Sequence, residues 1–132
     1  MFEKMQNSKK QGDLGVSAAI LHFQMNGVAV SIPFGDSQRY DLIADKDGEL
    51  KRVQVKTSAY MRNGSYEVGV KTCGGNRSGQ SVKKLDKNDY DILFVLTSDG
   101  SVYEIPADDV ESSTCLVLGS KYEKYKGRLG MS

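Results

Sequence analysis

The spacing of apolar and polar residues predicts one helix near the start of the chain, followed by a series of strands. From Gly12 to Met25, apolar side chains recur every three or four residues, which places them on one face of an α-helix. Asn26 and Gly27 predict the end of this helix, because glycine readily adopts the left-handed conformation that follows a last helical turn. The expected apolar face consists of Leu14, Ala18, Leu21 and Met25, widened by Ala19, Ile20 and Phe23.

Short apolar or alternating runs after the helix predict strands, separated by residues typical of turns. A tight turn at 46–48 predicts that the second and third strands pair as a hairpin. The glycine-rich stretch 73–79 is interpreted as a mobile basic loop, and a short helix is expected near 106–110. The expected strands are residues 28–32, 40–44, 50–57, 65–71, 91–97, 102–105 and, as the last strand of the chain, 114–118.

One helix followed by a run of strands predicts an α/β or α+β fold, with a mixed β-sheet core flanked by helices. The 132 residues fit one domain, residues 1–132, with a basic tail from about residue 119 that is either disordered or an extra DNA contact. The longest apolar run, 91–97, is too short to span a bilayer, and the first ten residues lack the apolar stretch of a secretory signal. We therefore expect a cytoplasmic protein whose two cysteines are reduced.

The net charge of +1 hides an uneven distribution of charge along the chain. Residues 51–87 carry nine basic and two acidic side chains, whereas residues 88–120 carry seven acidic and no basic ones. A one-sided basic region is typical of a face that binds a polyanion such as nucleic acid. Charges scattered over solvated loops are the alternative explanation.

Asp41, Gln54 and Lys56 form the arrangement with the clearest chemical meaning. Asp41 lies at the start of one predicted strand, and Gln54 and Lys56 share a face of the strand paired with it. A carboxylate and an amide oxygen on adjacent strands can hold a hard cation such as Mg²⁺. A lysine beside that cation can orient or deprotonate an attacking water, or stabilise charge on a phosphoryl group. On spacing alone, the polar outer face of a hairpin explains the same residues.

The residues around this arrangement carry a resemblance to a known family. They are Gly12-Asp-Leu-Gly15, Val30-Ser-Ile-Pro-Phe-Gly35, Arg39-Tyr-Asp-Leu-Ile43, Arg52-Val-Gln-Val-Lys-Thr57 and Tyr90-Asp-Ile-Leu-Phe-Val95. In these segments the chain resembles the PD-(D/E)XK nuclease superfamily, and more closely its small endonucleases associated with group I introns. The resemblance covers residues 12–105 and is most specific from 33 to 57. It implies a restriction-endonuclease-like fold in an intracellular protein of bacterial or phage type.

The resemblance also implies roles for individual residues. Asp41 matches the metal-binding aspartate, with Tyr40 in place of the proline, and Lys56 matches the lysine of the motif. Gln54 occupies the second acidic position, where it removes one metal-binding charge. The backbone carbonyl of Val55 is a further metal ligand.

A second departure from the family lies in the first helix. Many relatives carry a glutamate there, and Val16 occupies that position. Asp13 is the available substitute, either as a metal ligand or as the cap of the helix N-terminus.

By resemblance, the chain is a Mg²⁺-dependent endonuclease, with Mn²⁺ as a substitute, that cuts double-stranded DNA at an intron-homing site. One subunit has one active site, and a single module covers only about 600–1,000 Å² of a target, so we expect a homodimer or homotetramer. The alternatives are a Holliday-junction resolvase of the same fold, and a DNA-binding module without catalysis because of Val16 and Gln54. The candidate DNA contacts are Lys9, Lys10, Arg39, Tyr60, Arg62, Asn63, Lys71, Arg77, Lys83 and Lys84.

Overall fold

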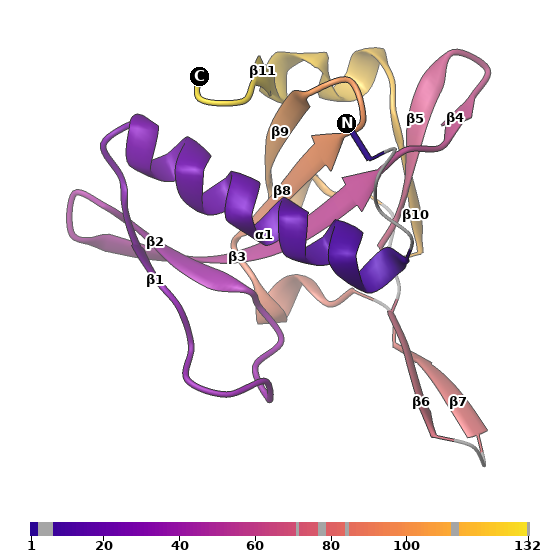
Figure 1. Ribbon diagram of the computed structural model, residues 1–132, viewed down its shortest axis with the longest axis horizontal. Coiled ribbons are helices and arrows are strands. Elements are labelled where there is room, and N and C mark those ends of the chain that lie inside the picture. Colours follow the sequence, from indigo (N-terminus) through magenta and orange to yellow (C-terminus); the bar gives the residue numbers. More distant parts are fainter. Residues whose placement is uncertain (3–6, 71, 77–78, 84, 112–113, 132) are drawn as a thin grey trace.

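A six-stranded mixed sheet forms the centre of the computed structural model (Figure 1), in the order β1-β2-β3-β8-β9-β11. The central pair, β3 and β8, is parallel, and every other neighbouring pair in this sheet is antiparallel. The strands are β1 (Ala29–Ser31), β2 (Leu42–Lys46), β3 (Glu49–Ser58), β8 (Ile92–Thr97), β9 (Ser101–Pro106) and β11 (Lys126–Arg128). The structure describes residues 1–2, 7–70, 72–76, 79–83, 85–111 and 114–131, with 72–76 and 79–83 as backbone alone.

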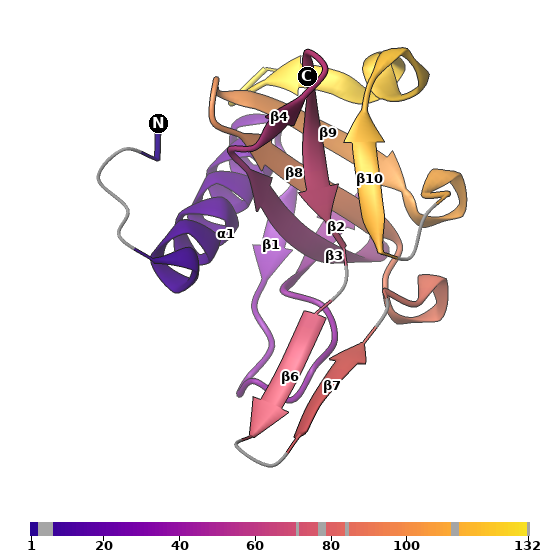
Figure 2. The ribbon, with the colours of Figure 1, turned by 90° about the vertical axis from the view of Figure 1, so that its right-hand side faces the viewer.

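The two faces of the central sheet are covered by different layers. Helix α1 (Ser8–Met25) crosses one face, and a three-stranded sheet in the order β10-β5-β4 covers the other (Figure 2). Its strands are β4 (Met61–Arg62), β5 (Ser65–Gly69) and β10 (Cys115–Leu118). Successive residues of β8 point into opposite cores. Phe94 packs under the helix, and Val95 packs under the second sheet. The mixed sheet expected from the sequence is confirmed.

Helix α1 begins four residues earlier than the sequence predicts, and its buried face matches the predicted one only in part. The side chain of Asn7 caps its N-terminus by accepting the N–H of Lys10. The cap function considered for Asp13 is therefore wrong. Leu21 and Met25, expected in the core, are 47% and 63% exposed. The buried residues of the helix are Gly15, Ala18, Ala19, His22 and Phe23.

Small residues on this inner face allow the helix to approach β3 closely. A Cβ atom at Gly15 would lie 2.6 Å from Cγ2 of Thr57, so only glycine fits there without a shift. One turn earlier, Gln11 donates a side-chain hydrogen bond of 2.9 Å to Thr57. The N-terminal half of α1 is therefore fixed against the same stretch of β3 that carries Gln54 and Lys56.

Three further expectations about the chain differ from the structure. The glycine-rich stretch forms a hairpin, β6 (Thr72–Asn76) and β7 (Gly79–Lys83), that projects from the body in both views (Figures 1 and 2). The basic tail is ordered, since the 3-10 helix Ser120–Tyr125 buries Tyr122 and leads into β11, which pairs with β9. The disordered alternative is therefore wrong, and the DNA contact stays a prediction. Because β11 follows them in the chain, residues 115–118 are not the last strand. Two other short 3-10 helices are Lys87–Asp89 and Ala107–Asp109, the latter where a short helix is expected.

Within the described residues, no helix is both long enough and apolar enough to cross a membrane.

Candidate active site

The hairpin of β2 and β3 positions the candidate catalytic residues. Its turn contains Asp47 and Gly48, both with positive φ, which is the geometry that two-residue hairpins favour. The register pairs Leu42 with Val53, so the position opposite Asp41 is Gln54. The predicted pairing of these strands is thereby confirmed. β2 itself begins at Leu42, and Asp41 is the residue at which the chain joins the sheet.

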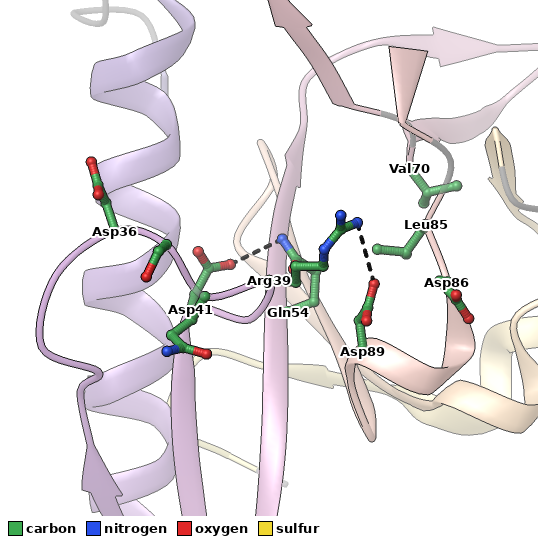
Figure 3. Close-up of a pocket in the computed structure, with 10 residues that line it drawn as sticks. Asp36, Arg39, Asp41, Gln54, Val70, Leu85, Asp86 and Asp89 are labelled. Carbon is green, nitrogen blue, oxygen red and sulfur yellow. Dashed lines mark hydrogen bonds and ion pairs between the residues drawn. The ribbon is translucent and has the colours of Figure 1, made fainter. Parts of the chain in front are cut away.

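The carboxylate of Asp41 is held by two donors from β3. Its Oδ2 atom accepts the backbone N–H of Val55 at 2.7 Å and the side-chain amide of Gln54 at 3.1 Å (Figure 3). Both hydrogen bonds end on Oδ2, which leaves Oδ1 for another partner. The carbonyl of Val55 faces the same side as its N–H, because both groups of a strand residue point toward one neighbouring strand. The carboxylate of Asp41 and the carbonyl of Val55 therefore place two possible metal-binding oxygens at the start of β2.

Lys56 is half-buried on the face of β3 that also carries Gln54. Burial lowers the pKa of Lys56 below its ordinary value, and the charge of Asp41 opposes that effect. Burial raises the pKa of Asp41, while the N–H of Val55 and the charge of Lys56 oppose it. Opposing shifts in two neighbouring groups are typical of acid–base sites, because each group is thereby moved toward neutral pH.

Asp41 and Gln54 open onto a hollow of about 440 Å³, which we call the Asp41 hollow. The loop between β1 and β2 supplies one side of it, and residues near the first 3-10 helix supply another. Arg39 and Asp89 bridge these sides with an ion pair of 3.6 Å (Figure 3). The lining consists of Asp36, Ser37, Gln38, Arg39, Asp41, Gln54, Val70, Leu85, Asp86 and Asp89.

The structure places the remaining metal candidate on the exposed surface of α1. Asp13 is exposed and is not among the residues that line the Asp41 hollow. Among the described residues, no three His, Cys, Asp or Glu side chains lie close enough together to hold a metal ion. The oxygen donors at Asp41, Gln54 and Val55 fit a hard cation in kind, but they carry a single formal charge.

The candidate DNA contacts are distributed over several elements. Lys9 and Lys10 are exposed in the first turn of α1, and Arg39 lies in the hollow. Tyr60, Arg62 and Asn63 belong to the β4–β5 hairpin, where Arg62 also pairs with Glu67 at 3.8 Å. Lys71, Arg77 and Lys84 lie outside the described residues, and Lys83 ends β7, of which only the backbone is described.

Sequence reasoning missed a second carboxylate that binds the other edge of β3. Asp91 accepts the backbone N–H of Arg52 at 2.8 Å and pairs with its guanidinium. The Arg52 side chain lowers the pKa of Asp91. Asp91 precedes β8 as Asp41 precedes β2, so an aspartate before a predicted strand was the available signal. Asp86 and Asp89 of the hollow were missed too, because no motif marks them.

Comparison with known proteins identifies the family to which this chain belongs. A family model described as PD-(D/E)XK endonuclease matches residues 6–128. Protein 5.3 of Escherichia phage T7 is 30% identical over 104 residues, which cover 79% of this chain and 84% of that protein. The solved structure of a bacterial homing endonuclease, I-Ssp6803I, superposes with a TM-score of 0.75 and 29% identity, covering 86% of this chain and 79% of the other. The chain belongs to the PD-(D/E)XK endonuclease family.

Proposed function

We propose that this chain is a site-specific endonuclease that hydrolyses phosphodiester bonds in double-stranded DNA, with Asp41, Gln54 and Lys56 as its catalytic residues. The observation that carries the proposal is the way in which the Asp41 carboxylate is held against β3. This carboxylate is oriented by the N–H of Val55, faces Gln54, and lies close enough to Lys56 for each charge to shift the pKa of the other.

Mg²⁺ is the cofactor in this proposal, with Mn²⁺ as a substitute. Asp41, the amide oxygen of Gln54 and the carbonyl of Val55 would hold it, whereas Asp13, exposed on α1 outside the Asp41 hollow, is left out of this ligand set. When bound, the cation supplies positive charge that polarises the phosphodiester and makes an attacking water more acidic. Because the protein contributes one formal charge at Asp41, a DNA phosphate adds the negative charge that the site lacks.

Lys56 acts on the water or on the phosphoryl group. In its protonated form the ammonium stabilises the negative charge that develops on the phosphate oxygens. In its neutral form, which burial favours, the amine accepts a proton from the attacking water. Both roles require the side chain to remain beside Asp41, and the β-strand backbone of β3 keeps it there.

The biological setting in the proposal is intron homing by a homodimer or homotetramer, with one domain per chain. The similarity to a bacterial homing endonuclease over most of both chains supports this setting. The single active site of each chain also supports an oligomer. One site cuts one strand, so cutting a duplex requires two copies related by a two-fold axis. In the same proposal, the candidate DNA contacts named from the sequence bind the duplex, both those within the described residues and those outside them.

Incubation of the purified protein with Mg²⁺ and a pool of linear duplex DNAs tests the function directly. We expect cleavage at defined positions, with ends that can be mapped by sequencing, and loss of cleavage in the presence of a chelator. Lys56→Ala should lose cleavage while binding DNA within a few-fold of wild type, since Lys56 acts on the reaction and not on recognition. Cleavage by Lys56→Ala at the wild-type rate contradicts the assignment of the site.

Two outcomes would favour the alternatives. Preferential cutting of four-way junctions over linear duplex would indicate a Holliday-junction resolvase. Binding of duplex DNA without cleavage in either Mg²⁺ or Mn²⁺ would indicate a DNA-binding module, in which the neutral Gln54 has removed too much of the metal site.

A further inference from the structure

Phe34 is an apolar side chain without a place in either core of the protein. It is fully exposed in the loop between β1 and β2, and Ile32, two residues earlier, is 57% exposed. Pro33 restricts the backbone between them, and Gly35 follows with a φ of 88°. An exposed phenyl ring forgoes the hydrophobic stabilisation that burial would bring. Among the exposed apolar side chains of the described residues, Phe34 is the most exposed, which makes it a candidate for contact with a partner.

The loop that carries Phe34 also forms one side of the Asp41 hollow. Four of its residues, 36–39, line the hollow, and the loop then enters the sheet at Asp41. Phe34 precedes Asp41 by seven residues, a length of chain that spans at most about 25 Å. Stacked base pairs rise 3.4 Å each along a DNA strand. A base step that Phe34 contacts would therefore lie within about seven base pairs of a phosphate at Asp41.

The surroundings of Phe34 favour DNA over a second copy of this chain. A stable interface buries about 800 Å² on each partner, whereas one aromatic side chain buries about 150–250 Å². Beyond Ile32, Pro33 and Gly35, the residues near Phe34 along the chain are polar and exposed, namely Ser31 at the end of β1 and Asp36, Ser37 and Gln38 in the loop. An exposed apolar ring bordered by polar groups is the form of side chain that enters between base pairs in proteins that bend DNA.

We propose that Phe34 is a wedge that inserts between adjacent base pairs of the bound duplex, with Ile32 against the same groove. Insertion unstacks one base step and bends the DNA away from the side that the ring enters. The inference rests on the proposed function, because the duplex must be bound at Asp41 for the loop to reach it. The wedge selects steps that unstack easily, such as TA, within about seven base pairs of the cut.

Fluorescence tests the insertion without cleavage. The chain contains no tryptophan, so Phe34→Trp places a single reporter at the tip of the loop. With no divalent cation present, addition of a linear duplex with repeated TA steps should quench its emission about twofold or more, because the indole stacks on bases. Leu50→Trp is the matched control. Leu50 is also exposed, but it lies at the start of β3, next to the turn of the β2–β3 hairpin. Equal quenching of both variants, or quenching of neither while a gel shift shows that both bind the duplex, overturns the proposal.

Cleavage gives a second, independent readout. Phe34→Ala should cut a fully paired duplex at the mapped site at least about tenfold more slowly than wild type, because unstacking one step costs a few kilocalories per mole. A mismatch at the unstacked step should restore most of the rate, since the DNA then no longer needs the wedge. Wild-type rates for Phe34→Ala on paired DNA overturn the wedge and leave the nuclease function intact. Absence of cutting by the wild-type protein itself contradicts the function instead.

Discussion

The carboxylate of Asp41 accepts the backbone N–H of Val55, with 2.7 Å between Oδ2 and the amide nitrogen. The donor is a peptide group in the middle of β3, which is paired on its other edge with β8. A backbone donor inside a sheet has little freedom to move, so it fixes the orientation of the aspartate before any ligand arrives. Both of the hydrogen bonds that β3 donates end on Oδ2, so Oδ1 takes part in neither.

Asp41→Asn should abolish cleavage and weaken the binding of Mg²⁺. The variant retains an oxygen that can accept the N–H of Val55, so the local fold is kept, but it loses the only formal charge among the proposed donors at Asp41, Gln54 and Val55. We expect the single-turnover cleavage rate to fall more than about a hundredfold. Asp36→Asn, in the same hollow, is the control and should stay within a few-fold of wild type. Comparable losses in both variants would assign the effect to the charge of the hollow as a whole.

Lys56→Met should lose cleavage and gain stability. Because burial lowers the pKa of Lys56, its charged form costs stability at neutral pH, and that cost disappears as the pH rises toward 10.5. Methionine keeps the apolar stem and removes the charge. We expect the melting temperature at pH 7 to rise by about 2–4 °C, which corresponds to about 1 kcal/mol for a chain of this size.

The matched control for Lys56→Met is Lys51→Met on the same strand. Lys51 is partly exposed and pairs with Glu49 on the surface, so its replacement should leave the melting temperature nearly unchanged. A fall in the melting temperature of Lys56→Met would show that Lys56 has a structural role and would count against its catalytic assignment.

Gln54→Glu should tighten metal binding in the protein without DNA. In the structure, Nε2 of Gln54 donates to Asp41, an interaction that a carboxylate replaces with repulsion between two acids. A divalent cation relieves that repulsion and gains a second charged ligand. Calorimetry with Mg²⁺ and Mn²⁺ should show affinity at least about tenfold higher than wild type, and more dependent on pH. Equal affinities would mean that residue 54 does not contact the metal.

The site could be predicted from the sequence largely because it lies in one hairpin. A tight turn at Asp47 and Gly48 fixes the register, and the alternation of side chains then brings Gln54 opposite Asp41. Both signals are local, so they can be found without knowing the tertiary structure. The parallel pairing of β3 with β8 joins residues about forty positions apart, and no local pattern specifies it.

The errors in the sequence analysis have physical causes as well. Apart from Phe23, the buried face of α1 consists of small residues and His22, so a search for large apolar side chains at helical spacing also selects Leu21 and Met25, which are exposed. The basic tail resembles a disordered segment in composition, yet Tyr122 supplies the buried contact that orders it. Asp89 reaches the hollow only through tertiary packing, which spacing along the chain does not reveal.

Two glycines of α1 should respond to alanine in opposite ways. Gly12→Ala adds a Cβ atom with nothing within 4 Å, so the better helix propensity of alanine should raise the free energy of unfolding by up to about 1 kcal/mol. Gly15→Ala places its Cβ atom 2.6 Å from Thr57, and overpacking should lower that free energy by about 1–3 kcal/mol. Urea denaturation of both variants measures the difference. A stabilising Gly15→Ala would mean that the helix does not approach β3 as closely as the structure shows.

His22 joins the C-terminal segment to the helix core, and this contact requires the neutral ring. Its Nδ1 accepts the N–H of Gly130 at 2.9 Å, and the ring packs against Phe23 and Phe94. Burial lowers the pKa of His22 from 6.5, and the nearby charge of Lys46 adds to this, whereas that of Glu104 opposes it. The unfolded chain therefore takes up a proton at a higher pH than the folded protein does.

The stability of the wild-type protein should therefore fall as the pH drops below 6.5, by up to about 1.4 kcal/mol per pH unit from this residue. Above pH 6.5 the contribution is fully present, because His22 is neutral in both states. His22→Gln keeps an oxygen that can accept the N–H of Gly130 but does not titrate, so its decline between pH 6.5 and 5 should be shallower. Urea denaturation of both proteins at several pH values measures the two slopes. Parallel slopes would show that His22 titrates in the folded protein as it does in the unfolded chain.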